Sequence, residues 1–169
     1  MTRRNGMGAV STAWLGAALL AAGGCQPARS PIARLEVAPA ELELAWPRFV
    51  ELEVELEPIA PLPPGVDRPI LFVHLLDEPG SVVRTFDHEL PGEWKTGSRV
   101  RYEHRIYQSA LASPLPAGRY LLSVGLYDPE VGRFALESAG LEIAKLEYQV
   151  ATVDVPATVA GGPEARFSG

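Results

Sequence analysis

The stretch FVELEVEL at 49–56 decides the fold class, because apolar and acidic residues alternate along it one by one. Successive side chains of an extended strand point to opposite faces, so one face is apolar and the other carries the glutamates. This pattern is typical of a strand in an antiparallel sheet that has one face on a core and one in water. The predicted inward-facing residues are Val50, Leu52, Val54 and Leu56.

Further strands are predicted on both sides of this stretch, separated by turns rich in Pro, Gly and Asp. ILFVHLL at 70–76 is apolar on both faces except for His74, which predicts a central strand. DEPGS at 77–81 predicts a turn that returns the chain along 82–87 as a hairpin. The remaining predicted strands are 32–37, 41–44, 100–107, 119–127, 133–136 and one or two within 141–155. About eight or nine short strands without helical periodicity favour a sandwich or a barrel, and the alternation fits a sandwich.

Composition and charge limit the function classes. The chain has 169 residues, 47% of them hydrophobic, with 16 Gly and 16 Pro, which is consistent with one turn-rich domain. Its formal net charge is −6 and no basic patch is visible, so we expect no nucleic-acid partner.

The N-terminal segment has the plan of an export signal. Arg3 and Arg4 precede an apolar run at 9–22, which is too short for a comfortable membrane span, and small residues lead from that run to Cys25. Three interpretations fit this plan: the signal of a lipoprotein that is lipidated at Cys25, an ordinary signal peptide with a chance cysteine, and an uncleaved anchor.

This segment resembles the lipobox of bacterial lipoproteins, although Ala22 stands where Leu is usual. The resemblance implies lipidation of Cys25, and Cys25 is the only cysteine of the chain. The partner would then be the lipid bilayer. Gln26, a residue other than Asp, implies sorting to the periplasmic face of the outer membrane. The predicted organisation is a signal peptide at 1–24, the lipidated cysteine and a tether at 25–32, a β-sandwich at 33–155 and a flexible tail at 156–169.

A second resemblance rests on FVHLLDEPGSVVRTFDHELP at 72–91, with Trp94 and Gly97 after it, and on LPAGRYLLSVGLYDPEVGR at 115–133. Together they resemble the immunoglobulin-like β-sandwich attached to some membrane glycosyltransferases of the dolichyl-phosphate-mannose type. The resemblance implies an extracytoplasmic fold and no activity, because the catalytic residues of those enzymes belong to their membrane part. The predicted fold class is therefore all-β, an immunoglobulin-like antiparallel β-sandwich of about seven to nine strands.

The three histidines show no spacing typical of a metal site, so we expect neither a metal nor a cofactor. Hydrogen-bonded core or edge histidines are the plainer interpretation of His74, His88 and His104. A functional polar cluster of His74, Asp87 and His88 is the alternative, because hairpin pairing can bring these side chains together.

Other candidate groups are the outward glutamates and the aromatic residues. Glu51, Glu53, Glu55 and Glu57 form a stripe that suits a solvated face, with a calcium site as the alternative. Trp94, in the loop PGEWKTG, is the foremost candidate for stacking on a sugar, and a buried Trp94 that caps the sandwich is the alternative. Trp46, Tyr102, Tyr107 and Tyr127 are further aromatic candidates.

No sequence motif of an enzyme is recognised, with no G-x-S-x-G elbow and no phosphate loop. The sequence thus favours a non-catalytic envelope module that binds a protein or a glycan. A structural subunit of an envelope or secretion complex is the first alternative, and a hydrolase that uses dispersed carboxylates is the second.

Overall fold

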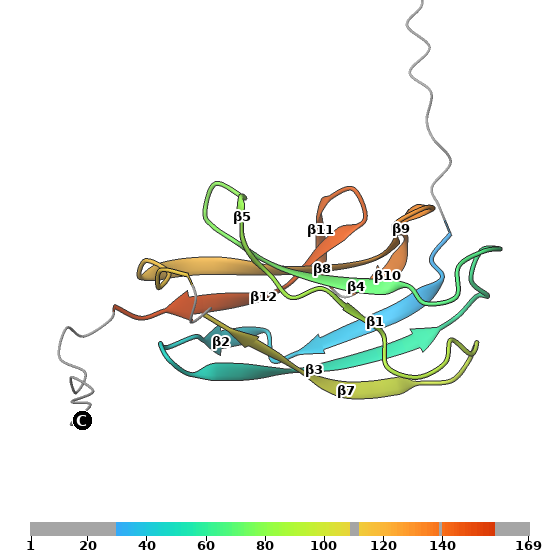
Figure 1. Ribbon diagram of the computed structural model, residues 1–169, viewed down its shortest axis with the longest axis horizontal. Helices are drawn as coiled ribbons and strands as arrows, with labels where there is room; N and C mark the ends of the chain where they lie inside the picture. The colour runs from blue at the N-terminus through green and yellow to red at the C-terminus, as the bar shows by residue number, and fades with distance from the viewer. Residues whose placement is uncertain (1–29, 109–111, 139, 158–169) are drawn as a thin grey trace, which may run out of the picture.

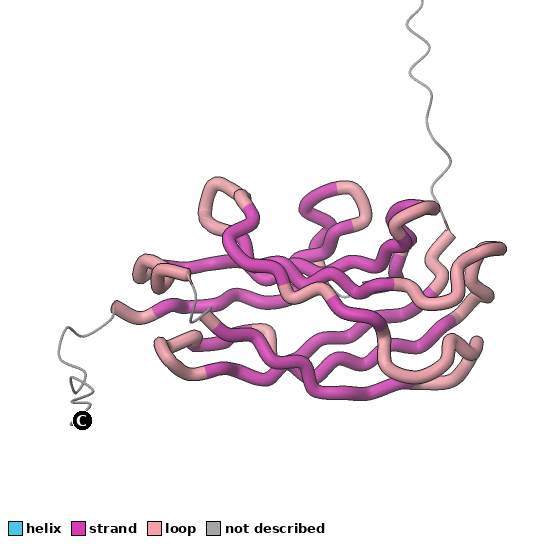
Figure 2. Tube along the Cα trace, viewed as in Figure 1, coloured by secondary structure: helices cyan, strands magenta, loops and turns pink. Residues whose placement is uncertain are grey.

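The computed structural model describes residues 30–108, 112–138 and 140–157. These residues form strands, turns and bends without any helix, and the strands lie in two layers (Figure 2). The predicted all-β sandwich is confirmed. The predicted signal peptide and Cys25 lie outside the described residues, as does most of the predicted tail.

The first sheet has the order β10-β1-β3-β7, and its strands β1, β3 and β7 form the lower layer in Figure 1. Its strands are β1 (Ala33–Ala38), β3 (Phe49–Pro58), β7 (Val100–Tyr107) and β10 (Leu136–Ser138). β3 pairs antiparallel with both β1 and β7, whereas β10 runs parallel to β1. The alternation in β3 is as predicted, since Leu52, Val54 and Leu56 are buried.

The second sheet has the order β11-β12-β8-β4-β5, with three short strands added to it. The strands of its main path are β4 (Ile70–Leu76), β5 (Val82–Thr85), β8 (Gly118–Asp128), β11 (Leu141–Ala144) and β12 (Glu147–Val155). The added strands are β2 (Glu41–Glu43) beside β12, β6 (His88–Glu89) beside β4 and β9 (Gly132–Phe134) beside β8.

Two features give the sandwich its immunoglobulin-like character. The chain pairs in the first sheet as β1 and then crosses to the second as β2, which runs parallel to β12. The Tyr120 hydroxyl, near the start of β8, donates a hydrogen bond to the Pro116 carbonyl at 2.9 Å, which is the corner expected at this position.

The core lies between the inner faces of the two sheets. Each fully buried aliphatic side chain there contributes about 1.5–3 kcal/mol to folding. The largest side chains with almost no exposure include Leu35, Leu52 and Leu56 from the first sheet and Leu71, Leu122 and Leu126 from the second.

The predicted strand 82–87 is divided in the structure. β5 ends at Thr85 and β6 begins at His88, although the Phe86 N–H still donates to the Val73 carbonyl at 2.8 Å. The register is the same on both sides of this interruption, with Thr85 opposite His74 and His88 opposite Leu71, whereas the register shift at Leu75 and Leu76 lies nearer the hairpin turn. Among the described residues the total is twelve strands, more than the predicted seven to nine, because short edge pieces add to the count.

Candidate functional site

The outer face of the second sheet carries a polar cluster around His74. His74 Nε2 lies 3.5 Å from Asp87 Oδ1, and His74 Nδ1 lies 3.6 Å from Glu147 Oε1. The structure therefore brings together two of the three residues of the predicted cluster. His88 is not part of it, because it pairs with Leu71 in the register and lies on the opposite face of the sheet.

Glu147 is the centre of this cluster and was missed by the sequence analysis. The Ser123 hydroxyl donates to Glu147 Oε1 at 2.7 Å, and Arg133 Nη1 donates to Oε2 at 3.0 Å. Burial raises the pKa of Glu147, but these hydrogen bonds and the charges of Arg133 and His74 outweigh it, so the pKa lies below its usual value. The sequence signal that could have identified this cluster is a polar residue in or beside an apolar strand, as Ser123 is in β8 and Glu147 is at the start of β12.

The aromatic ring of Phe72 packs against the same cluster. The Phe72 ring stacks on His74 with centroids 4.7 Å apart, and the Arg133 guanidinium lies over the Phe72 ring, 4.6 Å from its centroid. Gly125 leaves room for this ring, since a Cβ there would lie 2.2 Å from Phe72 Cζ. A pocket of about 290 Å³ opens beside the cluster, and its lining includes Tyr127.

The hydroxyl and carboxylate groups at the centre of the cluster are committed to protein partners, whereas His74 Nδ1 makes no hydrogen bond. Ser123 is fully buried and its hydroxyl proton points to Glu147, so it is not arranged as a nucleophile beside His74. Arg133 also donates to the Lys145 carbonyl at 3.0 Å and so ties β9 to the turn between β11 and β12. The hydrogen bonds of Arg133 to Lys145 and Glu147 therefore hold the hairpin formed by β11 and β12 against the rest of the second sheet.

The other two histidines lie between the sheets, at the edge where β6 faces β7. Their rings are stacked with centroids 4.1 Å apart and an interplanar angle of 11°. The Phe86 carbonyl accepts a hydrogen bond from His88 Nδ1 at 3.0 Å, so Nε2 of the neutral ring accepts the Tyr102 hydroxyl at 2.9 Å. Burial and the neighbouring His88 lower the pKa of His104 to about 4, and burial raises the pKa of Tyr102. We name these four residues, Phe86, His88, Tyr102 and His104, the ring cluster.

Trp94 is half-buried and packs against the core. Its indole N–H donates to the Ala60 carbonyl at 2.9 Å. This placement agrees with the capping alternative for Trp94, whose N–H is already used within the protein.

The glutamate stripe faces arginines of neighbouring strands. Arg105 pairs with Glu51 at 3.0 Å, Arg101 with Glu53 and Glu55, and Arg99 with Glu55 and Glu57. The described residues contain no group of three or more His, Cys, Asp or Glu arranged to hold a metal ion. The stripe is therefore one half of a ladder of ion pairs across the outer face of the first sheet.

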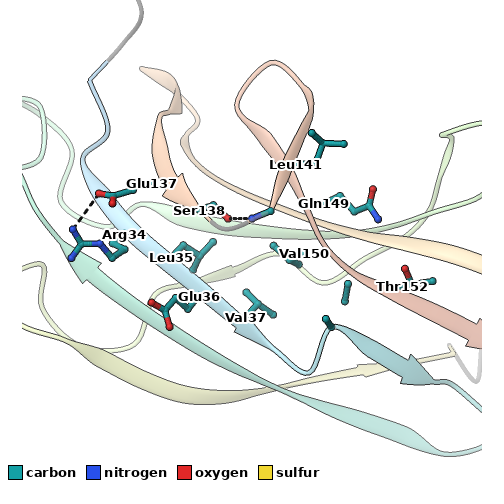
Figure 3. Close-up of a pocket in the computed structure, with 13 residues that line it drawn as sticks. Arg34, Leu35, Glu36, Val37, Glu137, Ser138, Leu141, Gln149, Val150 and Thr152 are labelled. Atoms are coloured by element: carbon teal, nitrogen blue, oxygen red, sulfur yellow. Dashed lines mark hydrogen bonds and ion pairs between the residues drawn. The ribbon is translucent and has the colours of Figure 1, made fainter.

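The largest concavity among the pockets described is a groove of about 940 Å³ on the opposite edge of the sandwich, between β1 and β12 (Figure 3). Residues of β1 and β12, among them Val37 and Val150, lie along the groove, and Leu141 of β11 stands at its wall. Leu141 is 71% exposed, the most among the large exposed hydrophobic side chains of the described residues. Sequence analysis did not predict this groove.

Arg34, Glu36 and Glu137 form the charged rim of the groove. Arg34 is engaged on both sides, with Glu57 and Glu137 each at 3.3 Å. Glu36 is exposed and carries a second negative charge at the rim, so the rim is acidic on balance.

Among the described residues, no helix is long and apolar enough to cross a membrane. The sequence matches no protein-family model and no curated protein sequence.

Several solved structures are similar in fold. The CARDB domain of a Pyrococcus furiosus protein, solved in complex with di-metal ions, is 15% identical over 74% of this chain and 88% of that chain, with a TM-score of 0.39. The alkylpurine DNA glycosylase AlkC of Pseudomonas fluorescens is 16% identical over 75% of this chain, with a TM-score of 0.42. A β-glucosidase of Listeria innocua in complex with glucose has the same identity and TM-score over 76% of this chain. The chain spans 31% and 16% of the length of these two enzymes, respectively. These likenesses concern the β-sandwich fold alone.

Proposed function

We propose that this chain is a non-catalytic binding module, anchored in the bacterial envelope by a lipid on Cys25, that engages a partner protein through the groove. The observation that carries the proposal is the groove itself, which combines a volume of about 940 Å³ with exposed Leu141 at its wall. Exposed apolar side chains beside a concave surface are typical of protein-interaction sites.

The absence of catalysis is supported by the His74 cluster. A hydrolase needs a nucleophile or a pair of carboxylates with room for substrate and water between them. Here the buried hydroxyl of Ser123 and the carboxylate of Glu147 bind each other, and Arg133 neutralises the carboxylate. The cluster's chemistry is thus directed to holding the β11–β12 hairpin in place.

The lipid anchor is supported by the resemblance to a lipobox and by the short distance from Cys25 to the domain. Seven residues lie between Cys25 and Ala33, where β1 begins, so these eight residue steps would place the start of the groove-lining strand within about 28 Å of the lipid. Two or more acyl chains make such anchoring stable. By the same resemblance, Gln26 implies sorting to the periplasmic face of the outer membrane.

Photo-crosslinking in living cells tests the binding surface. A photoreactive phenylalanine analogue replaces Leu141 in the full chain, and the control carries it at Val82, which is also exposed and also lies on a terminal strand of the second sheet. We expect a discrete crosslinked product, identified by mass spectrometry, from position 141 only. Equal products from both positions, or none, would contradict the proposal.

A second experiment tests the anchor. We expect the Cys25→Ala variant to leave the membrane fraction after carbonate washing, because it cannot accept the diacylglycerol thioether. If the variant stays with the membrane to the same extent as the native chain, lipidation is not what anchors the protein.

A further inference from the structure

The two strands that flank the groove each lack a neighbour over part of their length. β1 pairs with β3 from Ala33 to Ala38 but with β10 only from Ala33 to Leu35. On β12, β11 pairs as far as Gln149 and β2 begins at Thr152. Within the described ranges, therefore, no strand covers the groove side of β1 at 36–38 or that of β12 at 150–151.

The ends of this opening are set by two crossings between the sheets. At one end, Ala40 follows β1 and its carbonyl accepts the Thr152 N–H at 2.9 Å. At the other end, Gly140 lies so close to β12 that a Cβ would be 2.2 Å from the Gln149 carbonyl oxygen. Between the crossings, the uncovered part of β1 spans three residues, which is about 10 Å of strand.

An uncovered strand edge offers unpaired main-chain N–H and C=O groups to another extended chain. Proteins use such edges for recognition by strand addition, in which main-chain hydrogen bonds give affinity and pockets for alternate side chains give specificity. The groove supplies both parts, because apolar Val37 and Val150 line it beside the free edge while Glu36 and Glu137 stand at the rim.

We infer that the groove receives an extended segment of a partner protein, which adds as a strand to the free edge of β1 at 36–38. The inference rests on the proposed function and names its mode of binding and the chemistry of the partner. Apolar side chains of the segment face Val37, Val150 and Leu141, and the alternate side chains are Lys or Arg facing the acidic rim.

Charge argues for a partner of this kind over a second copy of the chain. Arg34 is occupied by Glu57 and Glu137, so the rim's exposed Glu36 is the group that a basic side chain meets. Edge-to-edge pairing of β1 with itself would bring two acidic rims together within a chain of net charge −6, which is unfavourable.

The probe is an acetylated, fluorescently labelled seven-residue peptide of alternating lysine and valine, titrated against the full chain in mild detergent. We expect saturable binding by fluorescence anisotropy and slower hydrogen exchange of those amides at 36–38 whose N–H groups face the groove and not β3. N-methylation of alternate peptide bonds of the probe, which removes main-chain donors but keeps every side chain, is expected to weaken binding at least about tenfold.

Matched variants locate the site. We expect Glu36→Lys and Leu141→Lys each to weaken binding about tenfold. The controls Glu103→Lys, on the far edge strand of the same sheet as Glu36, and Val82→Lys, on the far edge strand of the same sheet as Leu141, are expected to leave binding unchanged.

The outcomes separate this inference from the proposed function. If the N-methylated peptide binds equally well, strand addition is wrong although the groove binds. If no probe binds but position 141 crosslinks to a partner, the basic and apolar chemistry is wrong and the binding module stands. If neither experiment gives a signal, both fail. A dimer in sedimentation that Leu141→Lys dissociates would make a second copy the occupant and overturn the inference.

Discussion

The two long edges of the sandwich differ in what occupies the space between the sheets. Between β6 and β7 the space is filled by the ring cluster, in which His88, Tyr102 and His104 stack and hydrogen-bond between the sheets. Between β1 and β12 the space is left as a groove of about 940 Å³ with exposed Leu141 beside it. The filled edge shows that this fold can close a side with its own side chains, and under the proposed function the open edge is the surface that a partner covers.

The largest expected effect comes from emptying the filled edge. Tyr102→Ala removes a half-buried ring and the hydroxyl that binds His88, and we expect a loss of about 3 kcal/mol in the free energy of unfolding. Urea denaturation measures it. Tyr102→Phe, which keeps the ring, is expected to lose only about 1 kcal/mol. A loss below about 1 kcal/mol for the alanine variant would mean that the ring cluster does not stabilise this edge.

The next effect concerns the hairpin that forms the wall of the open edge. Arg133→Met leaves the Glu147 carboxylate, in a residue only 7% exposed, without its cation, and we expect a loss of about 2 kcal/mol. Faster hydrogen exchange at 141–148 is the accompanying sign that the hairpin has loosened. The control is Arg119→Met, which breaks the exposed pair with Asp154 and is expected to change stability by less than about 0.5 kcal/mol. Equal losses in the free energy of unfolding for both variants would show that Arg133 does not specifically stabilise the hairpin.

Acid is expected to weaken the filled edge selectively. The pKa of His104 is about 4 in the folded chain and about 6.5 when unfolded, so between these values the unfolded state binds more protons. The stabilisation from the neutral ring is complete above about pH 6.5 and is lost as the pH falls towards 4.

After allowance for the ring's partial exposure, the loss is about 1–2 kcal/mol. Urea denaturation at several pH values measures this loss, and His104→Gln should flatten the profile in that window. An unchanged profile in the variant would show that His104 is not the titrating group.

The smallest expected effect lies at the open edge. Leu141→Ala removes a side chain that is 71% exposed, so the free energy of unfolding should change by no more than about 0.5 kcal/mol. A thermal melt measures it. A loss near that of Tyr102→Ala would indicate that Leu141 packs in the fold itself and would end its interpretation as a contact for a partner.

The sequence predicted the strands well and the clusters in part. The period of two in 49–56 and the hairpin turn at Asp77–Gly80 are local signals, and both predictions are confirmed by β3 and the β4–β5 pair. The same periodicity explains why only one of two neighbours reached the His74 cluster. Asp87 and His88 are adjacent in an extended segment, so their side chains point to opposite faces.

The centre of that cluster depends on long-range pairing that no local pattern encodes. Glu147 reaches His74 because β12 pairs with β8 and β8 pairs with β4, which joins segments far apart in the chain. The groove likewise depends on where β10, β11 and β2 stop along their neighbours. Such end points are set by crossings between sheets and are not visible in a hydrophobic pattern.

By itself the sequence determined that the chain forms half-buried strands such as β3 and β7, because the alternation of apolar and polar side chains leaves only one way to bury them. It also placed the glutamates of β3 outward, where arginines of neighbouring strands meet them. Only the tertiary structure decided which edge of the sandwich is filled and which is open. That choice depends on the order and length of the strands at the sheet edges, which follow from main-chain pairing between distant segments.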